Sequence, residues 1–352
     1  MFEFVFKIQL FADAGSVVNI STGTVNAYNG SEYTPGTKNE DMSSTMKAFY
    51  DTALLENARA EAVYGQIGKQ QALPAHHGKS VEWRKWNTLP APDKLEEGVI
   101  PNGKKFGQSA IDVTIAQYGE YVTVSDVLEL HAVDDVILGA TEEVGAAMGK
   151  EADLLTRDAL LAGSTVVQYA SAGGTAPSEI SGVGKANLFT PDEVARAVTT
   201  LKKGNAPTID GKYIAVIHPS VAYDLRKDEA WINYHQYDAS TEIFTGEIGE
   251  LHGVRFVETT NAPVMAGGAS GAKVYATMIF GRDAFGVVAP EGAGMEMIIK
   301  SKEQAGGPLN QFSTIGGKMS HAAKVLYPER MVTVYSGSSF SDTDDANWVA
   351  RD

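Results

Sequence analysis

The first candidate for chemistry in this sequence is a phosphate-binding loop at Gly78-Lys79-Ser80. A Walker A loop places a lysine and a hydroxyl against nucleotide phosphates, and it needs a further glycine five residues before the second one so that the backbone can wrap them. That position is Leu73 here, and the preceding residues predict a helix rather than a strand. Gly182-Val183-Gly184 also lacks the third glycine and the preceding strand of a dinucleotide-binding turn. We therefore interpret the first motif as a polar turn and predict no nucleotide cofactor.

Metal, nucleophilic and acid–base sites are no better supported. His76 and His77 are adjacent, so they would not share one face of a helix as metal-binding pairs do. Ser220 lacks the Gly-x-Ser-x-Gly elbow, and the sequence assigns it neither a histidine nor an aspartate, so we interpret it as a helix-capping residue. The neighbours Glu96-Glu97 and Asp134-Asp135 would point apart in regular structure. The sequence predicts no catalytic residue, no metal ligand and no cofactor.

Large aromatic side chains offer binding chemistry instead. Trp83 and Trp86 lie in the run 81–86, which alternates in character with period 2, and residues 111–115 alternate in the same way. These runs predict a two-stranded ribbon with a Pro/Gly-rich tip and few contacts to its own subunit. Because an isolated ribbon is marginal in water, we expect it to lie on another copy of the chain. The tryptophans then have two open interpretations, packing beneath the ribbon or anchoring an interface.

A long helix is predicted directly after the ribbon. Ser125 is a suitable N-cap, apolar residues recur at helical spacing, and Gly163 is a plausible C-terminal stop. One helix over these residues would span roughly 55 Å, and we expect it to pack on late strands at 323–335. The alternative is two helices broken near Gly139 or Gly145.

The remaining elements predict an α+β fold. A helix runs from about Met46 to Ile67, and Thr190-Pro191-Asp192-Glu193 forms a capping box before a helix that stops near Gly204. Residues 213–217 form a buried strand, followed by a helix at 220–227. We expect further strands at 254–257, 274–280 and 295–299 in the same compact region, and late strands at 323–326 and 331–335.

Composition limits the class of protein. The 352 residues include no cysteine and carry a formal net charge of −15, and the longest runs of basic residues are pairs such as Lys104-Lys105 and Lys202-Lys203. This charge disfavours a nucleic-acid surface, and the lack of cysteine fits folding in a reducing cytoplasm. The apolar start, residues 1–12, is interrupted by Glu3 and Lys7, so we interpret it as an arm rather than a signal peptide. No stretch approaches the ~20 apolar residues of a membrane span.

The order arm, helix, ribbon, long helix, α+β domain and returning strands resembles the major capsid protein of tailed bacteriophages, with the capsid fold of the Hong Kong type. Local strings resemble the large phage and prophage group named for its podovirus type member. These strings are Leu10-Phe11-Ala12, residues 94–99 (KLEEGV), 117–127 (QYGEYVTVSDV), 249–259 (GELHGVRFVET) and 310–318 (NQFSTIGGK). Each string alone is only weakly specific to this group, whereas their order along the chain is more specific.

The resemblance implies an N-arm, an extended E-loop, a spine helix, a peripheral domain and an axial domain. We expect an N-terminal arm at 1–40, a helical segment at 41–79, the E-loop ribbon at 80–124 and the spine helix with its connector at 125–185. The axial domain would follow at 186–320, and returning strands with a tail at 321–352. Assembly contacts are expected at Trp83, Trp86, Leu95, Glu97 and Phe106.

The resemblance further implies an icosahedral shell of hexamers and pentamers, assembled in the host cytoplasm, that encloses double-stranded DNA without reading its sequence. The implied partners are other copies, a portal and scaffolding or decoration proteins, with no membrane. Some relatives crosslink Lys to Asn between subunits; Lys94, Lys104 and Lys105 lie in the right element, but no motif matches the partner Asn or the assisting Glu. The implied role is structural rather than enzymatic.

Two alternatives stay open. An encapsulin-type nanocompartment shares the fold and would be favoured by a neighbouring cargo-enzyme gene. A soluble α/β enzyme built on residues 190–335 would be favoured by a small oligomer with a ligand-sized pocket.

Overall fold

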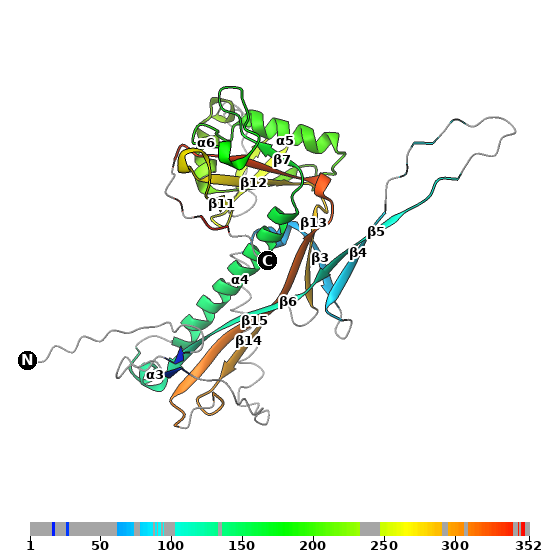
Figure 1. The fold of residues 1–352 in the computed structure, drawn as a ribbon. Helices are drawn as coiled ribbons and strands as arrows, with labels where there is room; N and C mark the ends of the chain where they lie inside the picture. Colours follow the sequence, from blue (N-terminus) through cyan, green and yellow to red (C-terminus); the bar gives the residue numbers. More distant parts are fainter. Residues whose placement is uncertain are drawn as a thin grey trace, which may run out of the picture. The chain divides into compact units, whose positions relative to one another are not determined.

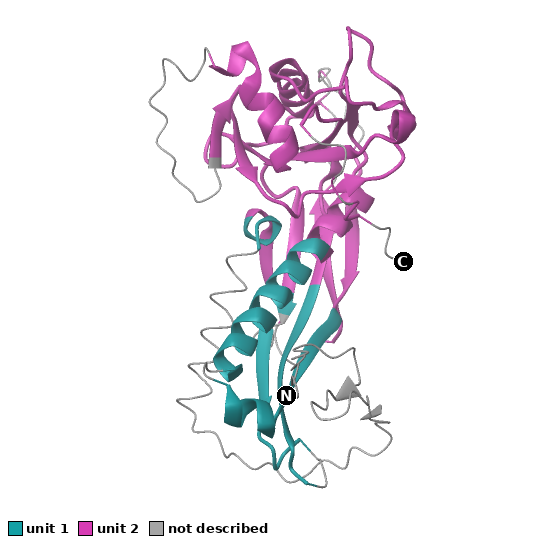
Figure 2. Cartoon of the chain, turned by 90° about the vertical axis from the view of Figure 1, so that its left-hand side faces the viewer, with its two compact units in different colours: residues 1–66, 116–154, 289–321 teal, residues 67–115, 155–288, 322–352 magenta. Residues whose placement is uncertain are grey.

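The computed structural model describes residues 16–17, 26–27, 62–73, 78–86, 89, 91–92, 94, 103–132, 136–232, 247–290, 295–305, 309–340, 344 and 346–348. The chain divides into two compact units, each built from separate stretches of sequence (Figure 2). Unit 1 contains residues 1–66, 116–154 and 289–321, and unit 2 contains residues 67–115, 155–288 and 322–352. A short pair, β1 (Ser16–Val17) and β2 (Asn26–Ala27), is antiparallel.

Unit 2 is built around a mixed sheet in the order β7-β16-β12-β8-β10-β9, with β11 beside β12. Figure 1 labels β7, β11 and β12 of this sheet. Its strands are β7 (Val167–Tyr169), β8 (Tyr213–Ile217), β9 (Glu247–Leu251), β10 (Val254–Glu258), β11 (Val264–Met265), β12 (Val274–Phe280) and β16 (Met331–Ser336). β8 pairs with β10 and β7 with β16 in parallel, whereas the other pairs are antiparallel. Every residue of β12 is buried, as expected for a central strand.

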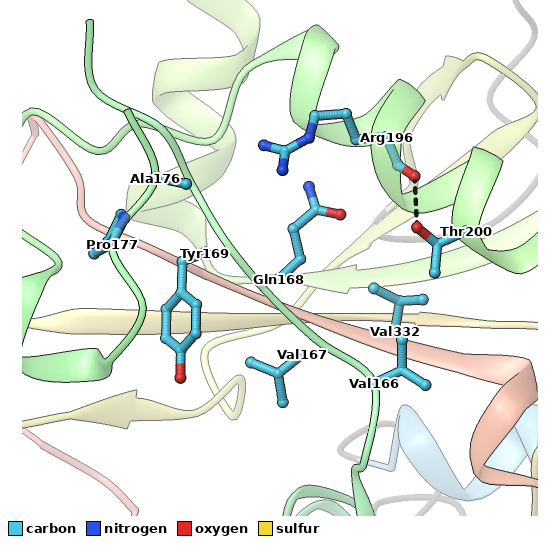
Figure 3. Close-up of a pocket in the computed structure, with 9 residues that line it drawn as sticks. All are labelled: Val166, Val167, Gln168, Tyr169, Ala176, Pro177, Arg196, Thr200 and Val332. Carbon is cyan, nitrogen blue, oxygen red and sulfur yellow. Dashed lines mark hydrogen bonds between the residues drawn. The ribbon is translucent and has the colours of Figure 1, made fainter. Parts of the chain in front are cut away.

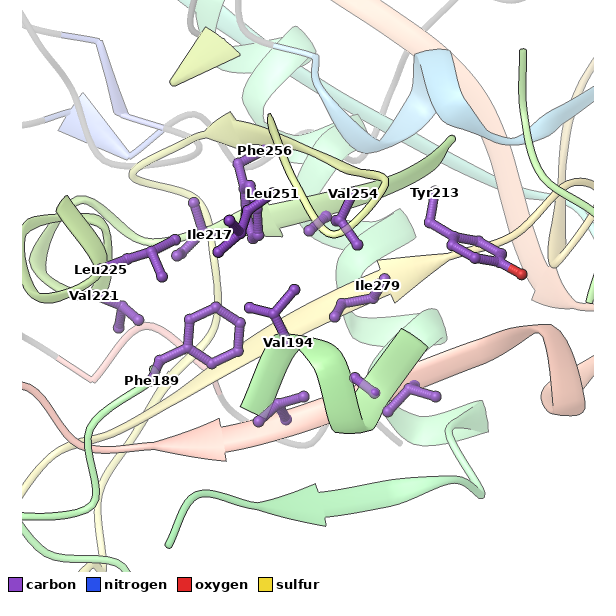
Figure 4. Packing of buried hydrophobic residues seen from close by; sticks show 14 of the residues in the cluster. Phe189, Val194, Tyr213, Ile217, Val221, Leu225, Leu251, Val254, Phe256 and Ile279 are labelled. Carbon is purple, nitrogen blue, oxygen red and sulfur yellow. The ribbon is translucent and has the colours of Figure 1, made fainter. Parts of the chain in front are cut away.

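Two helices of unit 2 complete its core. In α5 (Pro191–Lys203) the apolar residues Val194, Ala197, Val198 and Leu201 recur at helical spacing, and all are buried. They pack with Phe189, Ile217, Phe256 and Ile279 in one cluster (Figure 4). α6 (Pro219–Lys227) begins at His218, whose Nδ1 accepts from the Ser220 backbone N–H at 3.2 Å. The predicted helices and the strand at 213–217 are confirmed.

The predicted capping box is wrong in its chemistry. Thr190 is the N-cap of α5, but its side chain makes no capping hydrogen bond. Glu193 turns inward and accepts from the Ser171 hydroxyl at 2.6 Å and from Gln168 at 2.5 Å. Burial alone would raise the pKa of Glu193, but these hydrogen bonds and the charge of Arg196 together lower it. Glu193 therefore accepts from Ser171 and Gln168, which lie 22 and 25 residues earlier in the chain, and does not cap its own helix.

Unit 1 contains a long helix on a sheet. β6 (Ala116–Ser125) and β14 (Met295–Lys300) pair antiparallel with opposite edges of β15 (Phe312–Val325). We predicted that the strand at 295–299 belongs to the sheet of the compact region. That prediction is wrong, because the strand pairs with β15 in this sheet. In unit 2, β13 (Phe285–Pro290) pairs with residues 322–325 of β15, and β3 (Lys69–Leu73) follows in the strand order.

The single helix predicted from Ser125 to Gly163 is wrong. The structure has α3 (Asp126–His131), which ends at Ala132 in extended backbone, and α4 (Val136–Gly163). Gly139 and Gly145 lie inside α4, so neither marks the break that we had considered. The missed signal is Asp134-Asp135 directly before Val136, because aspartate favours the N-cap position over the helix interior.

The two predicted ends of that segment are confirmed. Ser125 caps α3, its Oγ accepting from the Leu128 N–H at 3.3 Å. At Gly163 an added Cβ would lie 2.6 Å from Cγ2 of Val325, so only glycine allows this contact with the late strands. Earlier in α4, Val144 and Met148 pack on Gly317 of β15 in the same way.

Of the helix predicted from Met46 to Ile67, only residues 62–67 are described. The prediction is wrong there, because Ala62 and Val63 are not helical and a separate short helix, α2 (Tyr64–Ile67), begins after them. The carboxylate of Asp153 in α4 is buried and accepts from the backbone N–H groups of Val63 and Tyr64 at 2.9 and 2.7 Å. These bonds fix the start of α2 in unit 1. None of the described helices is long and apolar enough to cross a membrane.

We expect His321 to make the subunit acid-sensitive. Burial in β15 lowers the pKa of His321 from its ordinary 6.5 to about 4. Between these values the unfolded chain binds a proton that the folded chain does not, so the free energy of unfolding falls as the pH falls from 6.5 to 4. The loss is at most about 3 kcal/mol. His321→Gln should flatten this part of a urea-unfolding pH profile, and a profile identical to that of the parent would contradict the prediction.

The end of the chain is fastened to unit 2 through Arg157 of α4. Its guanidinium is 1% exposed and donates to the Asn347 carbonyl at 2.9 Å and to Asn347 Oδ1 at 3.3 Å. Asn347 in turn accepts from Val264 N–H and donates to the Ala262 carbonyl. Asn347→Ala keeps the backbone carbonyl that accepts from Arg157 but removes the side-chain bonds to Arg157, Val264 and Ala262, so we expect the free energy of unfolding to drop by about 1–2 kcal/mol. Ala346→Ser, at the exposed neighbour, is the control in urea unfolding, and equal stability of both variants would refute the prediction.

Candidate assembly surface

The predicted ribbon is confirmed as a two-stranded sheet of its own (Figure 1). β4 (Ser80–Trp86) pairs antiparallel with β5 (Gln108–Thr114), with Trp83 opposite Ile111 and Trp86 opposite Gln108. Side chains alternate between the two faces of such a ribbon, so Trp83 and Trp86 point to opposite faces. β6 pairs with β15, and so the ribbon pairing ends at Thr114.

The inner face of the ribbon packs against its own unit. Val81 and Trp83 are 5% and 7% exposed and form a cluster with Val288 and Leu326. Gly286 lies directly beneath the indole, where an added Cβ would come within 2.7 Å of Trp83 Cζ2. We expected few contacts between the ribbon and its own subunit. This is wrong for this part of the ribbon, because its apolar face is buried against Val288 and Leu326 of the same chain.

The outer part of the ribbon presents a stacked aromatic pair. The rings of Trp86 and Phe106 lie 4.5 Å apart at 12°, yet each side chain is 58% exposed. Leu89, just beyond β4, is 49% exposed. Stacking leaves one face of each ring open to solvent, which makes this pair an apolar surface without a cover in the subunit. We call Trp86 and Phe106 the ribbon patch.

A charged contact holds the ribbon beside the patch. Lys85 Nζ lies 2.7 Å from Glu329 Oε1 and 4.4 Å from the ring centre of Tyr327, which Arg330 also covers at 3.8 Å. Burial alone would raise the pKa of Glu329, but the hydrogen bond from Lys85 and the nearby cations outweigh burial and lower it. The contact joins residues 244 positions apart, so no local sequence pattern indicates it.

The predicted site residues separate into three groups. Trp86 and Phe106 are brought together at the surface, whereas Trp83 is buried in its own chain. Leu95 and Glu97 lie outside the described residues. Leu89, three residues after Trp86, is an exposed apolar residue that sequence reasoning missed.

The lysines considered for crosslinking all lie near the tip. Lys94 and Lys105 are exposed, and Lys104 donates to the Ala91 carbonyl.

The structure brings an aspartate and a histidine to Ser220, but not in a catalytic arrangement. The Ser220 hydroxyl donates to Asp344 Oδ2 at 2.6 Å, and Tyr275 donates to the same oxygen at 2.5 Å. His218 uses Nδ1 to cap α6, so its acceptor nitrogen does not face the hydroxyl. Burial lowers the pKa of His218 despite the charge of Asp344. Across the described ranges, no cluster of three acidic or histidine side chains could hold a metal ion.

Comparison with known proteins gives one family and one fold. The family model described as "Phage capsid protein" matches residues 108–351, from β5 to the end of the chain. No curated protein matches. The capsid of the cyanophage P-SCSP1u is similar with 16% identity and a TM-score of 0.59, over 94% of this chain and 99% of that chain.

Two other solved structures are informative. The capsid of the cyanophage Pam1 is similar with 13% identity and a TM-score of 0.61, over 90% of this chain and 98% of that chain. A virus-like particle from Pyrococcus furiosus is similar with 12% identity and a TM-score of 0.50, over 82% and 99%. At these identities the likeness concerns the fold.

Proposed function

The chain belongs to the phage capsid protein family, and on that premise we propose that each subunit contacts the next copy in the shell through its ribbon patch. Family and fold make it a major capsid protein, whose copies assemble into an icosahedral shell and whose role is structural rather than catalytic. The observation that carries the proposal is the stacked, half-exposed pair of Trp86 and Phe106. Large aromatic side chains that are preordered and exposed are the residues that interfaces use as anchors.

The two faces of the ribbon differ in a way that supports this proposal. The face with Val81 and Trp83 is used inside the subunit, and the Lys85–Glu329 contact fixes the ribbon on that side. The patch is thereby held in place before a neighbour arrives, which lowers the ordering cost of association. Leu95 and Glu97 lie outside the described residues, and we propose that they extend this contact.

We also propose the finer organisation of the shell. The proposed N-arm, residues 1–40, lies outside the described residues apart from β1 and β2. We assign the ribbon to the E-loop, α4 to the spine helix, and the sheet of unit 2 with α5 and α6 to the axial domain. The subunits form hexamers and pentamers in the host cytoplasm, with a portal and scaffolding or decoration proteins as further partners. The net charge of −15 supports a container whose walls do not trap the enclosed double-stranded DNA.

A nanocompartment shell is the second candidate. Its support is the likeness to the virus-like particle from Pyrococcus furiosus, whereas the family match favours the phage capsid. Both candidates predict closed shells, and they differ in what the shells contain.

The test is expression of the full chain alone, followed by negative-stain electron microscopy of the purified protein. We expect closed shells or rings of capsomers. Small oligomers under all assembly conditions, with added scaffolding protein included, would refute a shell-forming role.

A further inference from the structure

We infer that the free edge of β7 binds an extended, acidic segment of a second copy of this chain, which adds a strand to the sheet of unit 2. This inference rests on the proposed function, because assembly of the shell supplies the second copy. It concerns a different surface from the ribbon patch.

β7 is an edge strand with one side paired. The N–H of Thr333 in β16 donates to the Val166 carbonyl at 3.0 Å, and the Ala170 N–H donates to the Tyr335 carbonyl at 2.9 Å. In a parallel pair the backbone groups of alternate residues point to the same side, so those of Val167 and Tyr169 point away from β16. No described residue forms a backbone hydrogen bond with either of them. Such an edge is a template for another strand.

A cavity of about 300 Å³ lies along this edge (Figure 3). Val167 and Tyr169 line it from the strand, Arg196 and Thr200 line it from α5, and Pro177 lies on a further wall. Pro177 has no N–H, so it cannot donate to the edge from within the subunit. The cavity therefore gives an incoming backbone both room and two donor–acceptor positions.

Side chains around the cavity select the chemistry of the segment. Arg196 Nη1 bonds both carboxylate oxygens of Glu193, at 2.9 and 2.8 Å, and the Arg196 side chain is 47% exposed. Its Nε and Nη2 groups stay available for an acceptor in the cavity, and a carboxylate is the strongest such acceptor. Val167, 40% exposed, offers an apolar contact on the other face of the strand. The fitting segment alternates acidic with apolar side chains.

A second copy is the occupant that this charge pattern favours. The chain carries 44 acidic residues against 29 basic ones, so a neighbouring copy presents more carboxylates than cations. Each subunit of a shell is surrounded by such copies.

Hydrogen–deuterium exchange of single amides tests the inference directly. We expect the amides of Val167 and Tyr169 to exchange at least about tenfold more slowly in purified shells than in free subunits. The Ala170 amide, bonded to Tyr335 within the subunit, should be protected in both states. Equal exchange of Val167 and Tyr169 in shells and subunits would overturn the inference while the shell-forming role stands. Protection that needs an added virion protein would overturn the second copy as occupant, and absence of any assembly would overturn the proposed function and this occupant together.

A matched pair of variants gives an independent readout. Val167→Pro removes the outward N–H of residue 167 and leaves the backbone groups that bond β16 in place. Val167→Ala also loses the valine side chain but keeps the outward N–H. We expect the yield of shells from Val167→Pro to be at least about tenfold lower than from Val167→Ala, with equal circular dichroism. Equal yields would overturn strand addition. Arg196→Gln should also lower the yield, and an unchanged yield would show that the segment is not recognised by its acidity.

Discussion

Trp86→Ala combined with Phe106→Ala is expected to give folded subunits that do not close into shells. Both rings are 58% exposed, so their loss removes little from the subunit's own core. Burial of a whole aromatic side chain contributes about 2–3 kcal/mol, and the exposed parts of two rings are together worth about 3 kcal/mol at each contact. That energy corresponds to more than about a hundredfold in each association step, and the loss recurs at every contact of the shell.

The measurement is electron microscopy with sedimentation velocity on the double variant, beside circular dichroism to establish folding. Trp86→Phe with Phe106 intact is the control, because it keeps an aromatic stack and should still form shells. Normal shells from the double alanine variant would show that the ribbon patch is not an assembly contact.

Trp83→Ala is expected to have the opposite consequence, loss of subunit stability. The indole is 7% exposed and packs with Val81, Val288 and Leu326, and it covers Gly286. Truncation leaves a cavity the size of a bicyclic ring, which costs ~3–5 kcal/mol in a packed site. We expect the midpoint of urea unfolding to fall accordingly, with the ribbon detached from its own unit.

Trp83→Phe is the matched control for this variant. It keeps most of the apolar volume and removes the indole N–H, which has no hydrogen-bond partner among the described residues. We expect the phenylalanine variant to lose less than half as much stability as the alanine variant. An alanine variant as stable as the parent would refute the packing role of Trp83.

Local sequence patterns predicted the elements that bury one face locally. The helix at 191–203 followed from the spacing of Val194, Ala197, Val198 and Leu201, and the ribbon followed from alternation in two runs. The order of such elements supported the resemblance to capsid proteins, which the family match and the fold confirm. These signals lie within a few residues of each other, so a single sequence contains them.

Other features could not be predicted from local sequence patterns, because they depend on contacts between residues that are far apart in the sequence. Alternation placed Trp83 and Trp86 on opposite faces, but only Val288 and Leu326, which follow Trp83 by more than two hundred residues, determine which indole is buried. The sequence around Glu193 predicts a capping box, but in the structure its carboxylate accepts from Gln168 and Ser171, which no local pattern indicates. The edge of β7 depends on its register with β16, which no local pattern of residues 167–169 indicates.

Electron cryomicroscopy of assembled particles, at a resolution that shows side chains, tests the central claim most directly. We predict closed shells in which Trp86 and Phe106 are buried against a neighbouring subunit while Trp83 stays within its own. Particles whose ribbon patch faces solvent, or a protein that forms only small oligomers, would contradict the claim.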